Sequence, residues 1–182
     1  MSRSTRLLAA LTLTAGAALA AAPAIATPDG TSMSQPGRHT PRIVQQWANA
    51  WNTADPVAMS KLFARDGTYT DHAFQASFTG PAGARQWGEI TRRAISPLKV
   101  TIHDTIVDGD RIAITWTFSG TFTTHHPFAP YNPAGKSFAV PATTILTLHH
   151  HRLTSAADYY NLADLLRQLN LPAGPFTPPS AP

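Results

Sequence analysis

Apolar and polar residues alternate on both sides of the Asp-Gly-Asp segment at 108–110. The apolar positions are Val100, Ile102 and Ile106 before this segment, and Ile112, Ile114, Trp116 and Phe118 after it. A period of two is typical of a strand that buries one face, and Asp-Gly is typical of a hairpin turn. The chain is therefore predicted to contain an antiparallel hairpin whose apolar face must be covered by other elements.

Three helices are predicted before this hairpin. Each begins where proline follows a capping residue or a glycine, at 40–41, 55–56 and 80–81, because proline suits the first position of a helix. The first helix has an apolar stripe at helical spacing, formed by Ile43, Val44, Trp47 and Trp51. The second is expected to include Phe63. A short strand at 68–71 and an irregular stretch at 73–79 should then lead into the third helix.

Two strands and a closing helix are predicted after the hairpin. A loop at 125–136 leads into a strand at 137–149, and a turn at 150–152 leads into a strand at 153–160. Pro141 removes a backbone donor from the first of these strands, so we expect a bulge or bend there. Leucines at helical spacing predict the closing helix, namely Leu162, Leu165, Leu166 and Leu169.

This order of elements favours an α+β domain over a parallel α/β sheet. Helices come early in the chain, and the strands predicted after them are antiparallel. A strongly curved sheet folded over helices makes a cone, whose interior is a natural ligand cavity. We therefore predict a single α+β domain at 40–172 with an apolar pocket.

The first 26 residues have the pattern of a secretory signal peptide. Arg3 and Arg6 precede an Ala- and Leu-rich run, and Ala24 and Ala26 form the small-x-small pattern of a cleavage site. A membrane anchor is the alternative, but the run only approaches spanning length and no basic flank follows it. We predict a secreted protein with no stable membrane anchor after cleavage. A flexible lead-in at 27–39 and a disordered Pro-rich tail at 173–182 are also expected.

The charge balance gives no reason to expect a nucleic-acid partner. Of the fourteen basic residues, Arg3 and Arg6 belong to the signal peptide, so twelve remain against ten acidic residues, a net charge of +2. A nearly neutral chain lacks the basic footprint of nucleic-acid-binding domains. The sequence also has no cysteine, so an exported domain must be held together by its core alone.

Five segments in order resemble the SnoaL-like polyketide cyclases, within the nuclear transport factor 2-like superfamily. They are VQQWANAWNTAD, LFARDGTYTDHAF, FTGPAGARQW, VDGDRIAITWTFSGTF and DYYNLADLLRQLNLP. The resemblance covers about residues 42–172 and implies a cone-shaped, curved antiparallel sheet wrapped over helices. It also implies chemistry on a hydrophobic, carbonyl-bearing small molecule without a cofactor, and a homodimer formed through the outer face of the sheet.

Asp158 is the first candidate catalytic residue. The resemblance implies an acid/base aspartate near the end of the sheet, and the matching string here is Asp158-Tyr159-Tyr160-Asn161, with Asn161 in place of the motif's last acid. Independently of the family, a carboxyl in an apolar cavity has a raised pKa, which allows proton transfer near neutral pH. The alternative is that Asp158 is structural and caps the closing helix.

Asp71 is the second candidate. It ends the strand predicted at 68–71, and strand alternation places Tyr69 and Asp71 on the same face. If that face is inward, Asp71 and Asp158 flank one bound carbonyl group, and Tyr69 belongs to the same site. The alternative is a solvent-facing Asp71 that caps the following turn. His72 is expected at the rim of the pocket, as a substrate-binding residue and not as the base.

Aromatic residues are expected to line the cavity as substrate-binding residues, although aromatic residues at such positions also serve as plain core. They are Trp87, Trp116, Phe118 and Tyr160. No metal site is predicted, despite eight histidines. The histidines at 125–126 and 149–151 fall at opposite ends of one strand, which is too long for a single site to use both groups.

Three functions remain open at this level. The first is an exported, cofactor-independent enzyme for aldol cyclisation or isomerisation, in which Asp158 is the acid/base and Asp71 an assisting acid or hydrogen-bond partner. The second is a non-catalytic extracellular domain that binds a hydrophobic small molecule, which export and Asn161 favour. The third is an assembly domain, which requires a filled cone.

Overall fold

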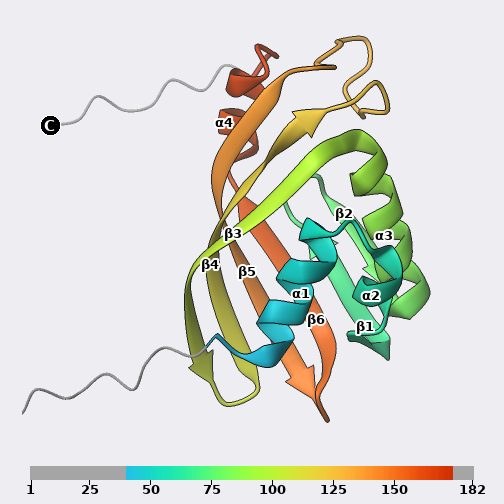
Figure 1. Cartoon of the computed structure of the whole chain (residues 1–182), viewed down its shortest axis with the longest axis vertical. Coiled ribbons are helices and arrows are strands. Elements are labelled where there is room, and N and C mark those ends of the chain that lie inside the picture. The colour runs from blue at the N-terminus through green and yellow to red at the C-terminus, as the bar shows by residue number, and fades with distance from the viewer. Residues whose placement is uncertain (1–39, 174–182) are drawn as a thin grey trace, which may run out of the picture. The chain divides into compact units, whose positions relative to one another are not determined.

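The computed structural model describes residues 40–173. The predicted signal peptide, the lead-in up to residue 39 and the tail from 174 lie outside the described residues. The helices are α1 (Arg42–Asn52), α2 (Pro56–Ser60), α3 (Gly80–Ala94) and α4 (Leu162–Gln168) (Figure 1). The strands are β1 (Phe63–Asp71), β2 (Ala76–Thr79), β3 (Ile95–Asp108), β4 (Arg111–Phe122), β5 (Ser137–His149) and β6 (Arg152–Tyr160). No helix between residues 40 and 173 is long and apolar enough to cross a membrane.

All six strands form one sheet in the order β2-β1-β6-β5-β4-β3. The predicted α+β class is confirmed. The sheet is antiparallel except between β1 and β6, which are parallel, so the expectation of a wholly antiparallel sheet is wrong at this pair. Parallel neighbours need a long crossover, and here the whole segment from β2 through β5 provides it.

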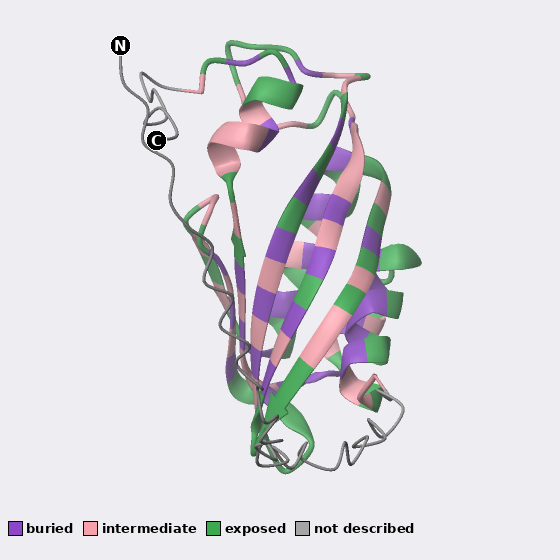
Figure 2. Cartoon of the chain, turned by 90° about the vertical axis from the view of Figure 1, so that its left-hand side faces the viewer, coloured by how far each residue is buried: buried purple, intermediate pink, exposed green. Residues whose placement is uncertain are grey.

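The predicted hairpin joins β3 to β4. Asp108 pairs with Arg111, and between them Gly109 has a φ of 57°, a left-handed conformation that glycine adopts without steric cost. Buried and exposed residues alternate along the strands (Figure 2). The alternation that is visible in the sequence therefore marks the two faces of the folded sheet.

Helices α1 and α3 lie against the inner face of the sheet (Figure 1). The apolar stripe of α1 buries Val44, Trp47 and Trp51. The ring of Trp47 packs edge-on against that of Trp116 in β4, with 5.3 Å between the centroids. Aromatic contacts of this kind contribute beyond simple area burial. Trp47 and Trp51 of the predicted stripe are both buried and belong to the core under the site.

Two element boundaries differ from the predictions near β1. Phe63 was expected in a helix, but it is the first residue of β1, where it is buried and pairs with Leu153 of β6. The stretch predicted as irregular contains β2, which pairs with β1 through Thr70 and Ser77. In both places pairing with a neighbouring strand outweighs the local pattern, a common outcome for short segments.

Pro141 causes no β-bulge in the pairing of β5 with β4, so this part of the prediction is wrong. The pairing of β5 with β4 is in continuous register past Pro141, and β6 pairs with β5 only from Ala142 onward. At Pro141, β5 is therefore paired with β4 on one side and unpaired on the other. On the unpaired side a missing N–H interrupts no hydrogen bonds between strands. Nearby, the side-chain amide of Gln168 in α4 bonds both the N–H and the C=O of Ala139 (2.8 and 3.0 Å) and so covers this edge.

Candidate active site

Asp71 and Asp158 lie side by side at the carboxyl-terminal ends of the parallel strands β1 and β6. They are direct partners in the strand register, and each is only 4% exposed. Both line one small internal cavity. The structure thus brings together the two carboxyls that were predicted as catalytic candidates from opposite ends of the domain.

Both carboxylate oxygens of Asp158 accept hydrogen bonds from buried hydroxyls. Thr144 Oγ1 donates to Oδ1 at 2.6 Å, and the Tyr69 hydroxyl donates to Oδ2 at 2.8 Å. Thr144 in turn accepts from Trp116 Nε1 at 2.9 Å. Since hydrogen bonds from both sides fix its rotamer, Asp158 is held rigidly at the inner end of the cavity.

The Tyr69 hydroxyl is also held from the helix side. It accepts hydrogen bonds from the indole Nε1 atoms of Trp47 and Trp51 in α1, each at 3.3 Å. Two donors on the oxygen leave the hydroxyl proton to point at Asp158. Burial and the nearby carboxyl raise the pKa of Tyr69 well above its ordinary value, so it remains a hydrogen-bond donor.

Asp71 has a different set of partners. The backbone N–H of Phe74 donates to its Oδ1, and the Tyr160 hydroxyl donates to its Oδ2, both at 2.8 Å. Asp71 therefore caps the turn after β1, as one sequence hypothesis held, but it does so while buried and not facing solvent. Burial and the neighbouring carboxyls raise the pKa of Tyr160, which keeps this tyrosine protonated as well.

The environment raises the pKa of both carboxyls. Burial is the main cause for Asp158, and the charge of Asp71 adds to it, so that the pKa of Asp158 is about 7 despite the opposing hydrogen bonds from Thr144 and Tyr69. Burial also raises the pKa of Asp71, against the hydrogen bonds from Phe74 and Tyr160. Two like charges in an apolar site resist ionising together, so the pair retains a proton near neutral pH.

The carboxyls lie where two cavities meet. The inner cavity, lined by both aspartates, measures about 20 Å³, which is room for about one water molecule. The outer cavity measures about 460 Å³ and has Asp71 but not Asp158 in its wall. The residues common to both cavities form what we call the neck: Asp71, Trp87, Thr91, Phe118 and Tyr160.

The wall of the outer cavity is mostly apolar. Its members beyond the neck include Phe74, Phe78, Ile90, Ile95 and Phe122, and His125 and His126 lie in the loop that borders it. This combination of an apolar wall with a few convergent polar groups is typical of a small-molecule site. The cavity is open rather than filled by side chains, which disfavours the hypothesis of a filled cone.

Most of the predicted substrate-binding residues line these cavities, but two do not. Trp116 lines the inner cavity, and Trp87, Phe118 and Tyr160 belong to the neck. Tyr69 lies behind Asp158 as its hydrogen-bond donor and is in the wall of neither cavity. His72 stacks on the exposed ring of Tyr159, with 4.4 Å between centroids, and is not at the rim.

The alternative role of Asp158 as a helix cap is not supported. Asn161 is the N-cap of α4, and its side chain accepts a hydrogen bond from the N–H of Asp164. Asparagine is among the residues favoured at this position. The departure from the family motif at Asn161 therefore has a structural role in starting α4.

Sequence reasoning missed two polar residues of the site. Thr144 is fully buried, and its sequence signal is one hydroxyl among the inward apolar positions of β5. Thr91 is 7% exposed and lies one helical turn after Trp87 on the inward side of α3. In each case the signal was a polar residue in an apolar stripe.

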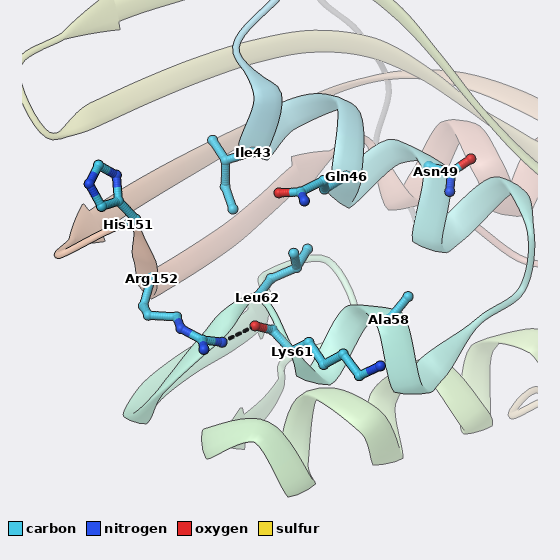
Figure 3. A pocket seen from close by; sticks show the side chains of 8 residues that line it. All are labelled: Ile43, Gln46, Asn49, Ala58, Lys61, Leu62, His151 and Arg152. Carbon is cyan, nitrogen blue, oxygen red and sulfur yellow. Dashed lines mark hydrogen bonds between the residues drawn. The ribbon is translucent and has the colours of Figure 1, made fainter.

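A second pocket, of about 560 Å³, lies between α1, the end of α2 and the turn after β5 (Figure 3). Gln46, Lys61, His151 and Arg152 are among its lining residues, and the guanidinium of Arg152 donates to the carbonyl of Lys61. It has no carboxylate and shares no residue with the cavities above. A buried titratable pair is the better mark of a reactive site, so we assign the candidate site to the aspartates.

The histidines at 125–126 and 149–151 lie on the two sides of β5 in the chain. His125 and His126 precede this strand, and His149 ends it beside the turn formed by His150 and His151. Between residues 40 and 173 there is no group of three or more His, Cys, Asp or Glu side chains placed to hold a metal ion.

Comparison with known proteins adds a family match and several similar structures. The profile of the SnoaL-like polyketide cyclase family matches residues 41–169. No curated protein matches the chain significantly.

A Catenulispora acidiphila protein with a ketosteroid isomerase-like fold, solved in complex with trimethylamine, is 38% identical, with a TM-score of 0.65. The match covers 77% of this chain and all of that one. TsrD from Streptomyces laurentii is 22% identical, with a TM-score of 0.61 and coverage of 72% and 98%. A nuclear transport factor 2-like protein from Burkholderia pseudomallei is 15% identical, with a TM-score of 0.59 and coverage of 70% and 94%. The last two support the fold alone.

Proposed function

Because the chain belongs to the SnoaL-like polyketide cyclase family, we propose that it transfers a proton on a hydrophobic, carbonyl-bearing small molecule without a cofactor. The observation that carries the proposal is Asp158, a buried carboxyl with a pKa of about 7 at the inner end of an apolar cavity. A general acid/base works best when its pKa is near the working pH. The apolar body of the ligand occupies the outer cavity, and its small reactive end passes the neck.

The proposed step is a balanced proton transfer. The Asp158 carboxylate takes a proton from the carbon next to the carbonyl, and the C–H electron pair moves into an enolate. If Asp158 returns the proton to another carbon, the product is an isomer. If the proton held by Asp158 is first replaced by one from solvent, its return to the original carbon gives hydrogen exchange. Alternatively, the enolate carbon attacks a second carbonyl of the ligand, and Asp158 protonates the new alkoxide, which is an aldol cyclisation. Asp71 raises the pKa of Asp158 and positions Tyr160 at the neck.

Deuterium incorporation tests this proposal. The methyl ketone 2-acetylnaphthalene is incubated with the protein in D₂O near neutral pH, and mass spectrometry follows exchange of its methyl protons. We expect Asp158→Asn to lower the protein-dependent rate by roughly 100-fold or more, the usual contribution of general acid/base catalysis. Asp66→Asn, at an exposed position of β1, should leave the rate unchanged. Exchange that persists in Asp158→Asn would remove Asp158 from the mechanism.

A second candidate function is the binding of an organic cation without turnover. The neck joins a carboxyl, Asp71, to the aromatic rings of Trp87, Phe118 and Tyr160, and cations bind favourably to such faces. The similar Catenulispora protein was solved with trimethylamine, which is a cation at neutral pH. Calorimetric titration with trimethylamine should then show binding that Asp71→Asn abolishes, with no deuterium exchange into 2-acetylnaphthalene.

Export and dimerisation are further parts of the proposal. The N-terminal pattern supports cleavage after Ala26, and mass spectrometry of protein from the culture medium should find a chain that begins at Thr27. The family resemblance supports a homodimer through the sheet face opposite α1 and α3, whose place in the fold can be followed in Figure 1, and sedimentation analysis should give twice the mass of one chain. A cell-bound, uncleaved chain would contradict the proposed export. A monomer at every concentration would contradict the proposed homodimer.

A further inference from the structure

Thr91 is a buried polar residue whose side chain has no partner. It lies in α3, it is 7% exposed, and it belongs to the wall of both the inner and the outer cavity. Within residues 40–173, its hydroxyl oxygen is the one fully buried side-chain nitrogen or oxygen atom without a hydrogen bond. Buried polar groups are nearly always paired, so an exception at a cavity wall indicates a role.

The local helix does not supply this partner. A helical threonine commonly donates its hydroxyl to the carbonyl one turn earlier, which here belongs to Trp87, but the Thr91 hydroxyl makes no such bond. Its proton and its lone pairs therefore remain available to a third group. Threonine also has two accessible side-chain rotamers in a helix, so rotation about χ1 can direct the hydroxyl toward the neck.

The other oxygen-bearing side chains of the neck are already paired with each other. Tyr160 donates its hydroxyl proton to Oδ2 of Asp71, and Oδ1 of Asp71 accepts from the backbone N–H of Phe74. Trp87 and Phe118 contribute aromatic surface to the rest of the neck. Among the oxygen-bearing residues of the neck, the hydroxyl proton that remains uncommitted is that of Thr91.

We infer that the Thr91 hydroxyl donates a hydrogen bond to an acceptor oxygen of the bound ligand at the neck. This inference rests on the proposed function and narrows its ligand class. The ligand carries a carbonyl oxygen between an apolar body, which lies in the outer cavity, and a small terminal group, which enters the inner one. Thr91 is then a specificity-determining residue that selects the carbonyl compound over a hydrocarbon of the same shape.

Two probes of matched shape test this inference, namely 2-acetylnaphthalene and 2-ethylnaphthalene, which differ in the carbonyl oxygen. Binding to wild type, Thr91→Val and Thr91→Ser is followed by tryptophan fluorescence. Wild type should prefer the ketone by roughly three- to tenfold, the range that one hydrogen bond contributes. Thr91→Val should lose this preference while binding the hydrocarbon unchanged, and Thr91→Ser should keep it.

The melting temperature distinguishes a role of Thr91 in ligand binding from a role in stabilising the fold. Thr91→Val removes an unpaired buried hydroxyl and keeps the shape of the side chain, so its melting temperature should equal or exceed that of wild type. A preference for the ketone that survives in Thr91→Val overturns the inference. So does an equal loss of affinity for both probes with a lower melting temperature, or a wild type that binds neither probe. A Thr91-dependent preference without deuterium exchange leaves the inference standing and contradicts the proposed turnover.

Discussion

The Tyr69 hydroxyl donates a 2.8 Å hydrogen bond to Asp158 across 89 residues of chain, and the Tyr160 hydroxyl donates to Asp71 across the same separation. Each of the two parallel strands thus supplies one acid and one tyrosine that bonds the acid of the other strand. The arrangement follows from the register, which pairs Asp71 with Asp158, and from the period of two, which puts each tyrosine on the same face as its neighbouring acid. The two carboxyls therefore behave as a coupled pair.

The first prediction concerns the pH dependence of stability. The pKa of Asp158 is raised from about 3.8 to about 7 on folding, so the stability it contributes is fully present below the lower value and is lost as the pH rises through the higher one. The loss is at most on the order of 4 kcal/mol. Asp158→Asn should remove this loss, so that its free energy of unfolding in urea changes less than that of wild type between about pH 4 and about pH 8. Equal slopes for the two proteins, with Asp66→Asn as the control, would contradict the burial argument.

The second prediction is a shift in the titration of Asp158 itself. The hydrogen bond from Thr144 stabilises the ionised carboxylate and lowers its pKa. Thr144→Val removes this donor, so the pKa of Asp158 should rise above about 7, as followed by the ¹³C chemical shift of the carboxyl. Thr143→Val changes the outward neighbour in β5 and should leave the titration in place. A downward shift in Thr144→Val would be inconsistent with the network.

The third prediction concerns the stability of the Tyr69 network. Tyr69→Phe leaves the indole N–H groups of Trp47 and Trp51 and one oxygen of Asp158 without their partner. We expect a loss of about 2–3 kcal/mol in the free energy of unfolding, as for other unsatisfied buried polar groups. Tyr159→Phe, at a ring that is 46% exposed, should change it by less than about 0.5 kcal/mol. Similar effects of the two substitutions would show that the buried network contributes little.

The fourth prediction concerns the turn between β5 and β6. His150 and His151 have φ values of 46° and 62°, a left-handed conformation that Asn-Gly adopts more readily in a two-residue hairpin turn. Combining His150→Asn with His151→Gly should stabilise the protein by about 0.5–1 kcal/mol in urea unfolding. The double alanine variant keeps the strain and should not gain stability. A loss of stability with Asn-Gly would mean that the two imidazoles make contacts that matter more than the strain.

The fifth prediction separates His72 from the ligand site. Because His72 stacks on Tyr159 and lines neither cavity, His72→Ala should not change the affinity for 2-acetylnaphthalene. Trp87 belongs to the neck, and Trp87→Ala should weaken binding by roughly tenfold through the loss of aromatic contact. Fluorescence titration measures both variants, and a large effect of His72→Ala would require a different binding mode.

Local sequence patterns were sufficient for most of the elements, although not for β2, and for the identity of the two acids. The alternation around Gly109, the stripe that contains Trp47 and Trp51, and the positions of Asp71 and Asp158 at strand ends could each be identified from neighbouring residues. Such patterns carry information because side chains repeat with a period of two in strands and 3.6 in helices. They also place each acid on a face of its strand, although not beside its partner.

Only the tertiary structure decided which residues meet. The parallel pairing of β1 with β6 joins Asp71 to Asp158, and it also determines that Tyr69 supports Asp158 while His72 faces away from the cavities. The missing N–H of Pro141 breaks no hydrogen bond of the sheet, because the pairing of β5 with β6 ends at Ala142. No local pattern reveals where this pairing ends. The pKa of Asp158 likewise depends on burial and on a charge contributed by a distant segment. The sequence by itself determined most of the strands, the helices and the identity of the two acids. The coupling of the two acids arose from contacts between residues far apart in the chain, because the desolvation and charge that shift a pKa come from spatial neighbours and not from sequence neighbours.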